Sequence, residues 1–502
     1  MLDLQYGKDE SGARRMLGRA SLAGIGSACQ LGLSFITGLV TARMLGAAGF
    51  GLLNLARTLL DNAAVVTRLG LDLGLQRFFG ETSSGTGRTT RVRVLRQVRL
   101  VASLLAVLPL LAVALGLGRL LETHVYMHAN FARILLCMAL ALPFITDIAV
   151  LGGAYRGALK LGPAVLAENI LLPLARLVFI LLLFAAGWGL WAVAVGTTLG
   201  AVLAAGWLAL RARRDFTAEP APPASWNTAR RVIGYSGVLA VAVLVTMVTS
   251  TMDLLMLGHY VSATHLGQYA LAKQLLVLTT VVSVAFNQSM GGVIAERHFS
   301  GDRVGMLRVQ SQVFRWIALA TLPLFVVFLL WGAPLMSLFG PSFTIPQPVV
   351  AWLAVGQFMV ALFGPMGWAL SMTGRQLLEL AALLCGLVLV VVLGRLAIPV
   401  WGQLGAAVAT CTALAVTNLL RALCVRRAFG AFPIAAGTWL IMAGGLAVGL
   451  ATKLLVAQLP LPAFGQAVLG SACFLACYAV LCRSHLRGAL LMFRQRAVAG
   501  VG

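Results

Sequence analysis

The chain has 502 residues, of which 60% are hydrophobic and only 11% charged, and its mean hydropathy is +0.94. Ordinary soluble domains carry about 25% charged residues, so this composition excludes a soluble globular protein and indicates that lipid surrounds most of the chain. The net charge of +23 would suit nucleic-acid binding, but the basic residues lie in short loops beside apolar segments. There they set orientation and attract anionic lipid. We therefore expect anionic membrane lipids, and no nucleic acid, as partners.

Fourteen apolar segments are long enough to cross a bilayer as helices, which requires about 20 residues each. Backbone groups in hydrocarbon must be satisfied internally, and the alternating pattern of an outer-membrane barrel is absent. The predicted fold class is an all-α polytopic membrane protein with about 14 transmembrane helices. The expected spans are 20–42, 51–71, 99–118, 133–154, 164–186, 190–210, 233–257, 267–291, 314–333, 349–372, 377–398, 403–424, 434–456 and 466–482.

An internal duplication relates the first six spans to the next six. Residues 42–51 end with Gly51, and the segment from Gly51 to Arg57 aligns with the segment from Gly267 to Lys273. Two further pairs recur at an offset of 213: Trp188-Gly189 as Trp401-Gly402, and Arg213-Arg214 as Arg426-Arg427. Duplications of this size in a membrane chain are typical of transporters.

The duplication predicts the domain organisation. Residues 1–210 form an N-lobe, the proline-rich stretch 211–232 is a cytoplasmic linker, residues 233–427 form a C-lobe, and residues 428–502 add two spans and a cytoplasmic tail. An even number of crossings separates spans one and seven, so both lobes face the same way. Their pseudo-two-fold axis is then expected along the membrane normal, with a space between the lobes.

The distribution of lysine and arginine predicts the orientation. These residues gather in 88–99 and 211–231, whereas the loops 259–265 and 334–348 contain none. The positive-inside rule therefore places both termini in the cytoplasm, with an uncleaved first helix.

Charged residues inside the expected spans mark the candidate site. A charge at the bilayer centre costs about 3 kcal/mol, so each must face a bundle interior or a wet cavity. If span two is one continuous helix, its polar residues lie within about a 60° arc, with Arg57 and Asp61 deepest. These residues are Asn54, Arg57, Asp61, Arg68 and Asp72.

Two further cations accompany this polar face. Lys273, the repeat counterpart of Arg57, recurs with Thr280 and Asn287 at seven-residue spacing in span eight, and Arg176 lies near the middle of span five. Together they predict a cationic cavity that suits phosphate, because guanidinium groups bind phosphate through paired hydrogen bonds. The alternative is an Arg57–Asp61 ion pair that only pins span two to its neighbours.

The remaining candidate residues are two carboxylates and the cysteines. Asp147 and Asp253 are candidates for ion coupling, although a lone carboxylate does not identify the ion. All eight cysteines lie in or at the ends of spans, with no Cys-x-x-Cys motif. No cofactor, metal or disulfide framework is expected.

One segment resembles a known family. The residues Ala42-Arg43-Met44-Leu45-Gly46, followed by Gly49-Phe50-Gly51-Leu52-Leu53, resemble the signature of bacterial polysaccharide repeat-unit flippases of the Wzx type. These belong to the same superfamily as lipid II flippases and MATE multidrug exporters, named MOP. Ala47 stands where the family often has proline, and the acidic residue typical of the lipid II branch is absent before Asp61.

The resemblance implies two MATE-like lobes around a V-shaped cavity. It also implies transfer of undecaprenyl-diphosphate-linked oligosaccharides from the inner to the outer leaflet of a bacterial inner membrane. These would serve as units of O-antigen, capsule or exopolysaccharide. Arg57, Lys273 and Arg176 would hold the diphosphate, and a polysaccharide polymerase and a chain-length regulator would be partners. The alternatives are a cation-coupled drug exporter, a lipid II flippase, or an enzyme such as a glycan polymerase. The enzyme is disfavoured because such polymerases usually carry a large periplasmic loop, which this chain lacks.

Overall fold

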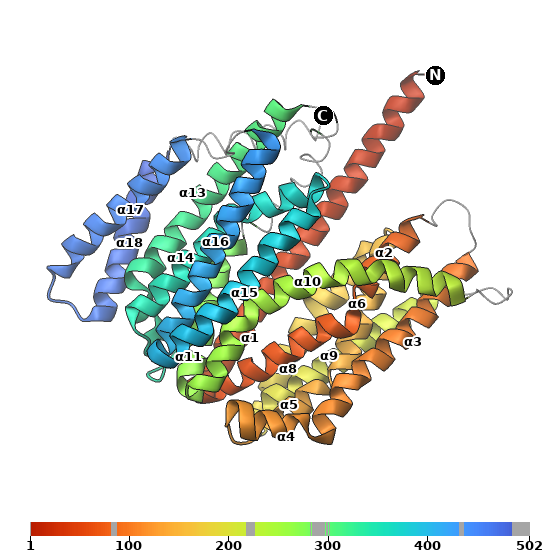
Figure 1. Cartoon of the computed structure of the whole chain (residues 1–502), viewed down its shortest axis with the longest axis horizontal. Coiled ribbons are helices and arrows are strands. Elements are labelled where there is room, and N and C mark those ends of the chain that lie inside the picture. Colours follow the sequence, from red (N-terminus) through yellow and green to blue (C-terminus); the bar gives the residue numbers. More distant parts are fainter. Residues whose placement is uncertain are drawn as a thin grey trace. The chain divides into compact units, whose positions relative to one another are not determined.

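Helices make up nearly all of the protein in the computed structural model (Figure 1), which describes residues 2–81, 88–216, 226–281, 283, 297, 300, 302–430 and 436–483. No strand occurs among these residues. The predicted all-α membrane fold is confirmed.

Twelve segments of the described chain are long and apolar enough to cross a membrane. The first of them, Gly24–Arg68, contains two of the expected spans, because Gly46 (φ 66°, ψ −177°) interrupts α1 (Leu2–Arg68). Glycine adopts such a positive φ without steric cost, so one residue separates two helices. The expected span 267–291 begins in α11 (Ala263–Val277) and continues into residues outside the described ranges. The result agrees with about fourteen spans.

The chain divides into two compact units: Met1–Leu271 with Gly394–Ala406, and Ala272–Leu393 with Ala407–Gly502. The expected lobe boundaries stay a prediction. Besides α1 and the start of α11, the first unit contains α2 (Leu71–Glu81), α3 (Arg88–Ala112), α4 (Gly118–Leu120), α5 (Phe131–Ala139), α6 (Leu142–Gly157), α7 (Leu161–Val165), α8 (Leu172–Ala185), α9 (Leu190–Asp215) and α10 (Trp226–Tyr260). Three π-helical segments, Val113–Leu117, Leu121–Tyr126 and Leu166–Leu171, join some of them.

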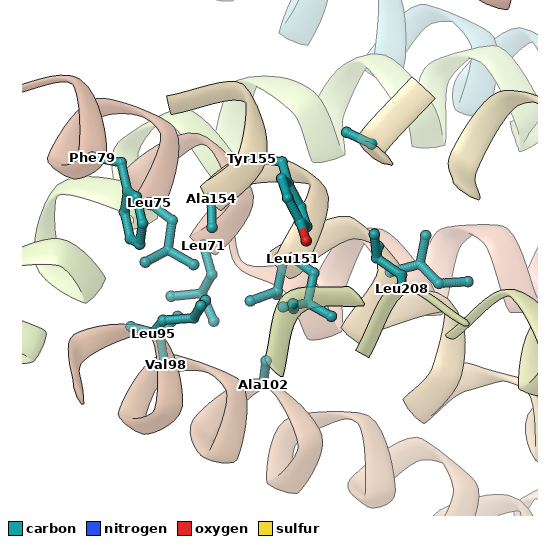
Figure 2. Packing of buried hydrophobic residues seen from close by; sticks show 14 of the residues in the cluster. Leu71, Leu75, Phe79, Leu95, Val98, Ala102, Leu151, Ala154, Tyr155 and Leu208 are labelled. Carbon is teal, nitrogen blue, oxygen red and sulfur yellow. The ribbon is translucent and has the colours of Figure 1, made fainter. Parts of the chain in front are cut away.

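A buried cluster, most of it from four helices, organises the first unit. Figure 2 shows Leu71, Leu75 and Phe79 of α2, Leu95, Val98 and Ala102 of α3, Leu151, Ala154 and Tyr155 of α6, and Leu208 of α9. Lipid is as apolar as these side chains, so close packing rather than removal from water stabilises such contacts within the bilayer.

Small residues allow this close packing. A Cβ atom on Gly153 of α6 would lie 2.2 Å from the Asp72 carbonyl oxygen of α2. A Cβ atom on Gly200 of α9 would lie 2.8 Å from the backbone nitrogen of Arg176 in α8. Both glycines belong to Gly-x-x-x-Gly motifs, the pattern that permits close helix packing in membranes.

The second unit contains the end of α11, α13 (Arg303–Met336), α14 (Gln347–Met372), most of α15 (Gln376–Trp401) and of α16 (Gln403–Phe429), α17 (Ala436–Ala457) and α18 (Ala463–Leu481). The last two helices lie side by side and pack on α13 (Figure 1). Gly445 and Gly449 of α17 approach Leu322 and Val326 of α13, as their Gly-x-x-x-Gly spacing predicts.

The internal repeat is visible in backbone geometry. Gly189 and Gly402, the glycines of the repeated Trp-Gly pairs, both have φ of 52°. Each immediately precedes a long helix, α9 at Leu190 and α16 at Gln403. The repeated sequence therefore encodes the same turn twice.

Candidate functional site

A charged pair occupies the middle of the second half of α1. The Arg57 Nε lies 3.6 Å from Asp61 Oδ2, and the two side chains are 37% and 38% exposed. Asn54, one turn before, donates from its amide to the Phe50 carbonyl oxygen at 2.9 Å. The ion pair of the alternative hypothesis therefore exists, but both charges remain accessible, which a purely structural pair does not need.

Arg176 of α8 is the third charge at this place. Its backbone packs against Gly200 of α9, and α8 also contacts α1. Its guanidinium is subject to the charges of Arg57 and Asp61. The structure thus brings together three of the predicted site residues, which are far apart in sequence.

The side chain of Arg176 is incompletely satisfied. Its Nε is buried and has no hydrogen-bond partner among the described residues. A buried donor without a partner is costly, and more so when it carries charge. Two arginines and one aspartate leave one positive charge in excess, so an anion would satisfy both the charge and the free donor.

The expected polar face of span two is shorter than predicted. α1 ends at Arg68, and Leu69 and Gly70 have positive φ before α2 begins at Leu71. Asp72 therefore lies on another helix, and the assumption of one continuous helix was wrong. Arg68 donates from its Nε to the Ala64 carbonyl oxygen at 3.0 Å.

Asp72 belongs to an ion-pair group at the α2–α6 contact. Its carboxylate lies 4.0 Å from the Arg156 guanidinium, which also donates to Glu168 Oε2 at 2.6 Å. Glu168 lies against Gly152, where a Cβ atom would overlap its carboxylate. These charges hold helices together rather than face the Arg57 group.

A similar glutamate occurs in the second unit. Glu379 of α15 accepts from Arg421 Nε of α16 at 3.0 Å and also pairs with the Arg421 Nη2. It too lies against a glycine, Gly367 of α14. The two glutamates lie near the starts of corresponding expected spans, Glu168 in 164–186 and Glu379 in 377–398.

The predicted site residues of span eight lie in the second unit. Lys273 is half-buried in α11, and Thr280 donates from its hydroxyl to the Val277 carbonyl oxygen at 2.7 Å. Asn287 lies outside the described residues. A role for these residues beside Arg57 stays a prediction.

The two candidate coupling carboxylates are both engaged. Asp147 of α6 accepts two hydrogen bonds from Arg99 of α3, at 2.7 and 2.8 Å. Asp253 of α10 is buried, and it accepts from the Tyr269 hydroxyl and from the Leu254 backbone amide, each at 2.8 Å. In this structure both join neighbouring elements, and their role in ion coupling stays a prediction.

Sequence comparison now identifies the family. The model of the polysaccharide biosynthesis protein family matches residues 20–290, more than half of the chain. The chain belongs to this family. The resemblance to proteins of polysaccharide biosynthesis is thereby confirmed.

One curated relative of this polysaccharide biosynthesis protein carries a glycan-related name. The chain is 26% identical over 199 residues to the "Probable low-salt glycan biosynthesis flippase Agl15" of Haloferax volcanii. The match covers 39% of this chain and 42% of that protein, so the chain spans less than half of the relative's length.

Solved structures share the fold of this family member. The lipid II flippase MurJ in an inward closed conformation has a TM-score of 0.72, with 14% identity over 93% of this chain and 99% of that one. An inward-facing multidrug resistance MATE transporter of the MOP superfamily has a TM-score of 0.66, with 14% identity over 80% and 95%. The chain therefore shares its fold with these two proteins.

Proposed function

We propose that the protein is a flippase that moves undecaprenyl-diphosphate-linked oligosaccharide repeat units from the inner to the outer leaflet of a bacterial inner membrane. Transport would proceed by alternating access of two lobes, with both termini cytoplasmic. The family and its glycan flippase relative support the class of substrate. A polysaccharide polymerase and a chain-length regulator would act with it.

The observation that carries this proposal is the buried Arg176 Nε without a hydrogen-bond partner among the described residues, in a guanidinium subject to the charges of Arg57 and Asp61. A diphosphate offers several oxygen acceptors and negative charge, and it would meet the excess positive charge here. A cationic drug would be repelled by the same charges. Lys273, the repeat counterpart of Arg57, is the third proposed cation.

The experiment is reconstitution of the purified protein in liposomes with defined undecaprenyl-diphosphate glycans, followed by a leaflet-resolved assay. Arg176→Ala and Arg57→Ala should each reduce flipping by about tenfold, the effect of losing one charged hydrogen bond of about 1.4 kcal/mol. Arg57→Lys should keep part of the activity because the charge survives. Arg133→Ala is the matched control, since Arg133 is an exposed arginine of α5.

Three results would contradict the proposal. If Arg57→Ala loses protein abundance and Asp61→Asn restores it, the pair is structural. If the protein moves cationic dyes and not diphosphate lipids, the drug exporter is correct. Movement of lipid II in preference to oligosaccharide carriers would favour the lipid II flippase.

A further inference from the structure

The two copies of the repeated segment touch each other inside the first unit. A Cβ atom on Gly51 would lie 2.2 Å from the Ala263 carbonyl oxygen and 2.6 Å from the Gly267 backbone nitrogen. A Cβ atom on Gly267 would lie 1.8 Å from the Ala47 carbonyl oxygen and 2.9 Å from the Gly51 backbone nitrogen. Each glycine thus packs against the carbonyl of the residue four positions before the other glycine. We name these four residues the glycine crossing.

The crossing follows the sequence repeat. Gly51 aligns with Gly267, and the same offset of 216 relates Ala47 to Ala263. The contact is therefore reciprocal between equivalent residues, so a local two-fold axis passes between the two glycines. Neither the charged site nor helix formation requires glycine in both copies, whereas this contact does.

Further contacts continue along α1 from the crossing. Leu55 Cδ1 lies 2.9 Å from the Cβ position of Gly258, near the end of α10. Asn62 donates from its amide to the Thr251 hydroxyl of α10 at 3.0 Å. The second half of α1 thus lies along α10, beginning at the crossing.

The charged site follows immediately on the same helix. Arg57 and Asp61 lie six and ten positions after Gly51, which is about 9 and 15 Å along a helix. On the proposed orientation, the crossing is on the outer side of the charged site. A substrate that leaves the site outward along α1 would therefore pass the place where α1 and α11 touch.

We propose that the glycine crossing is the outer gate of the transporter: the gate is shut when Gly51 and Gly267 touch, and it opens when the two repeats separate there. The inference rests on the proposed function. A contact made by backbone and small side chains closes only at very short range, so one added methyl group prevents closure. Overfilling a packed interior in this way is destabilising.

The test is the accessibility of the charged site from outside. A single cysteine, Asn54→Cys, is placed in a protein whose eight native cysteines have been replaced. An impermeant maleimide is then added to the outer face of intact cells. Gly51→Ala and Gly267→Ala should each raise labelling by about tenfold, the equivalent of about 1.4 kcal/mol against the shut state.

Gly32→Ala on α1 and Gly206→Ala on α9 are the matched controls, because a Cβ atom at either position meets nothing within 4 Å. They should leave labelling unchanged. Equal labelling in the crossing variants and the controls would overturn the proposal.

A second measurement needs no change at the glycines. Asn62→Cys and Thr251→Cys, joined by a short thiol cross-linker, would hold α1 to α10. Flipping should stop when the cross-link forms and return on reduction; flipping that continues at full cross-linking would refute the gate. Labelling needs no substrate, so increased labelling in a protein that moves no lipid-linked glycan would refute the proposed function and leave the gate standing.

Discussion

The ion pair between Arg99 and Asp147 gives a test of whether Asp147 is structural or couples transport to an ion. The substitution Asp147→Asn keeps the size and one acceptor but removes the negative charge and one of the two hydrogen bonds from Arg99. The side chains of Arg99 and Asp147 are 29% and 15% exposed, so the pair is neither fully buried nor free in solvent.

The expected loss follows from these values. A hydrogen bond to a charged group contributes about 1.5–3 kcal/mol, and removal of one partner of a fully buried pair costs about 3–5 kcal/mol. Because this pair is partly exposed, we expect a loss near the lower values. Asp147→Asn should reduce the free energy of unfolding by about 2 kcal/mol. The melting temperature of the purified protein in detergent should fall by a few degrees.

A double-mutant cycle supplies the control. Arg99→Gln should reduce the free energy of unfolding by a similar amount. The double variant should be destabilised by less than the sum of the two single variants, because each single substitution already removes the interaction of the pair. If Asp147→Asn abolishes transport without any change in melting temperature, and Arg99→Gln does not affect transport, the structural interpretation is refuted. Asp147 would then be the coupling residue.

Three other predictions concern pH, packing and topology. Burial lowers the pKa of His128 below its usual 6.5, although a hydrogen bond with the Gly258 backbone opposes this. As the pH falls, the unfolded chain therefore takes up the proton before the folded protein does. The contribution of His128 to the free energy of unfolding is full above about pH 6.5 and decreases below it. The melting temperature of His128→Gln should therefore decrease less on acidification than that of the unaltered protein. Gly153→Leu should abolish stable protein because its side chain would overlap the backbone of α2, whereas Gly162→Leu, with open space around it, should accumulate normally; measured abundance decides. Thr217→Cys, in the expected linker, should react with thiol reagents only from the cytoplasm, and outside labelling of intact cells would refute the fourteen-span topology.

Helices in lipid are predictable from sequence because their apolar residues need no periodic pattern, only sufficient length. The expected span 377–398 lies within α15, Gln376–Trp401, and the expected span 466–482 corresponds to α18, Ala463–Leu481. The turn at Gly46 lies in the expected gap between the first two spans, 43–50. What sequence did not indicate was that this turn requires a single residue.

Local chain reversals were harder to predict. α2 was missed because Leu69, one of the two residues that separate it from α1, adopts a positive φ that leucine rarely takes. The polar face of span two was then extended wrongly to Asp72. A glycine alone, at Gly70, does not distinguish a helix end from a tolerated interior position.

Contacts between distant residues could not be predicted. Arg176 was assigned to the same cavity as Arg57 from its charge and its depth in span five, because a separation of 119 positions gives no spacing signal. The carboxylates were recognised as buried, but their partners Arg99 and Tyr269 come from other helices. The repeat aligned Gly51 with Gly267, but it did not predict that the two would lie in contact.

The two glutamates show how far the duplicated halves have diverged since they were copies. Glu168 pairs with Arg156 of α6, which comes earlier in the chain. Glu379 pairs with Arg421 of α16, the next helix in the chain. At the offset of 213, the position of Arg421 corresponds to Leu208, which is buried in the cluster of the first unit. An exchange of equivalent helices between the halves would therefore leave a glutamate without its cation on one side and bury an arginine among apolar side chains on the other. The two halves therefore share a repeated backbone arrangement but differ in their ion pairs. A helix of one half could not take the place of its counterpart in the other.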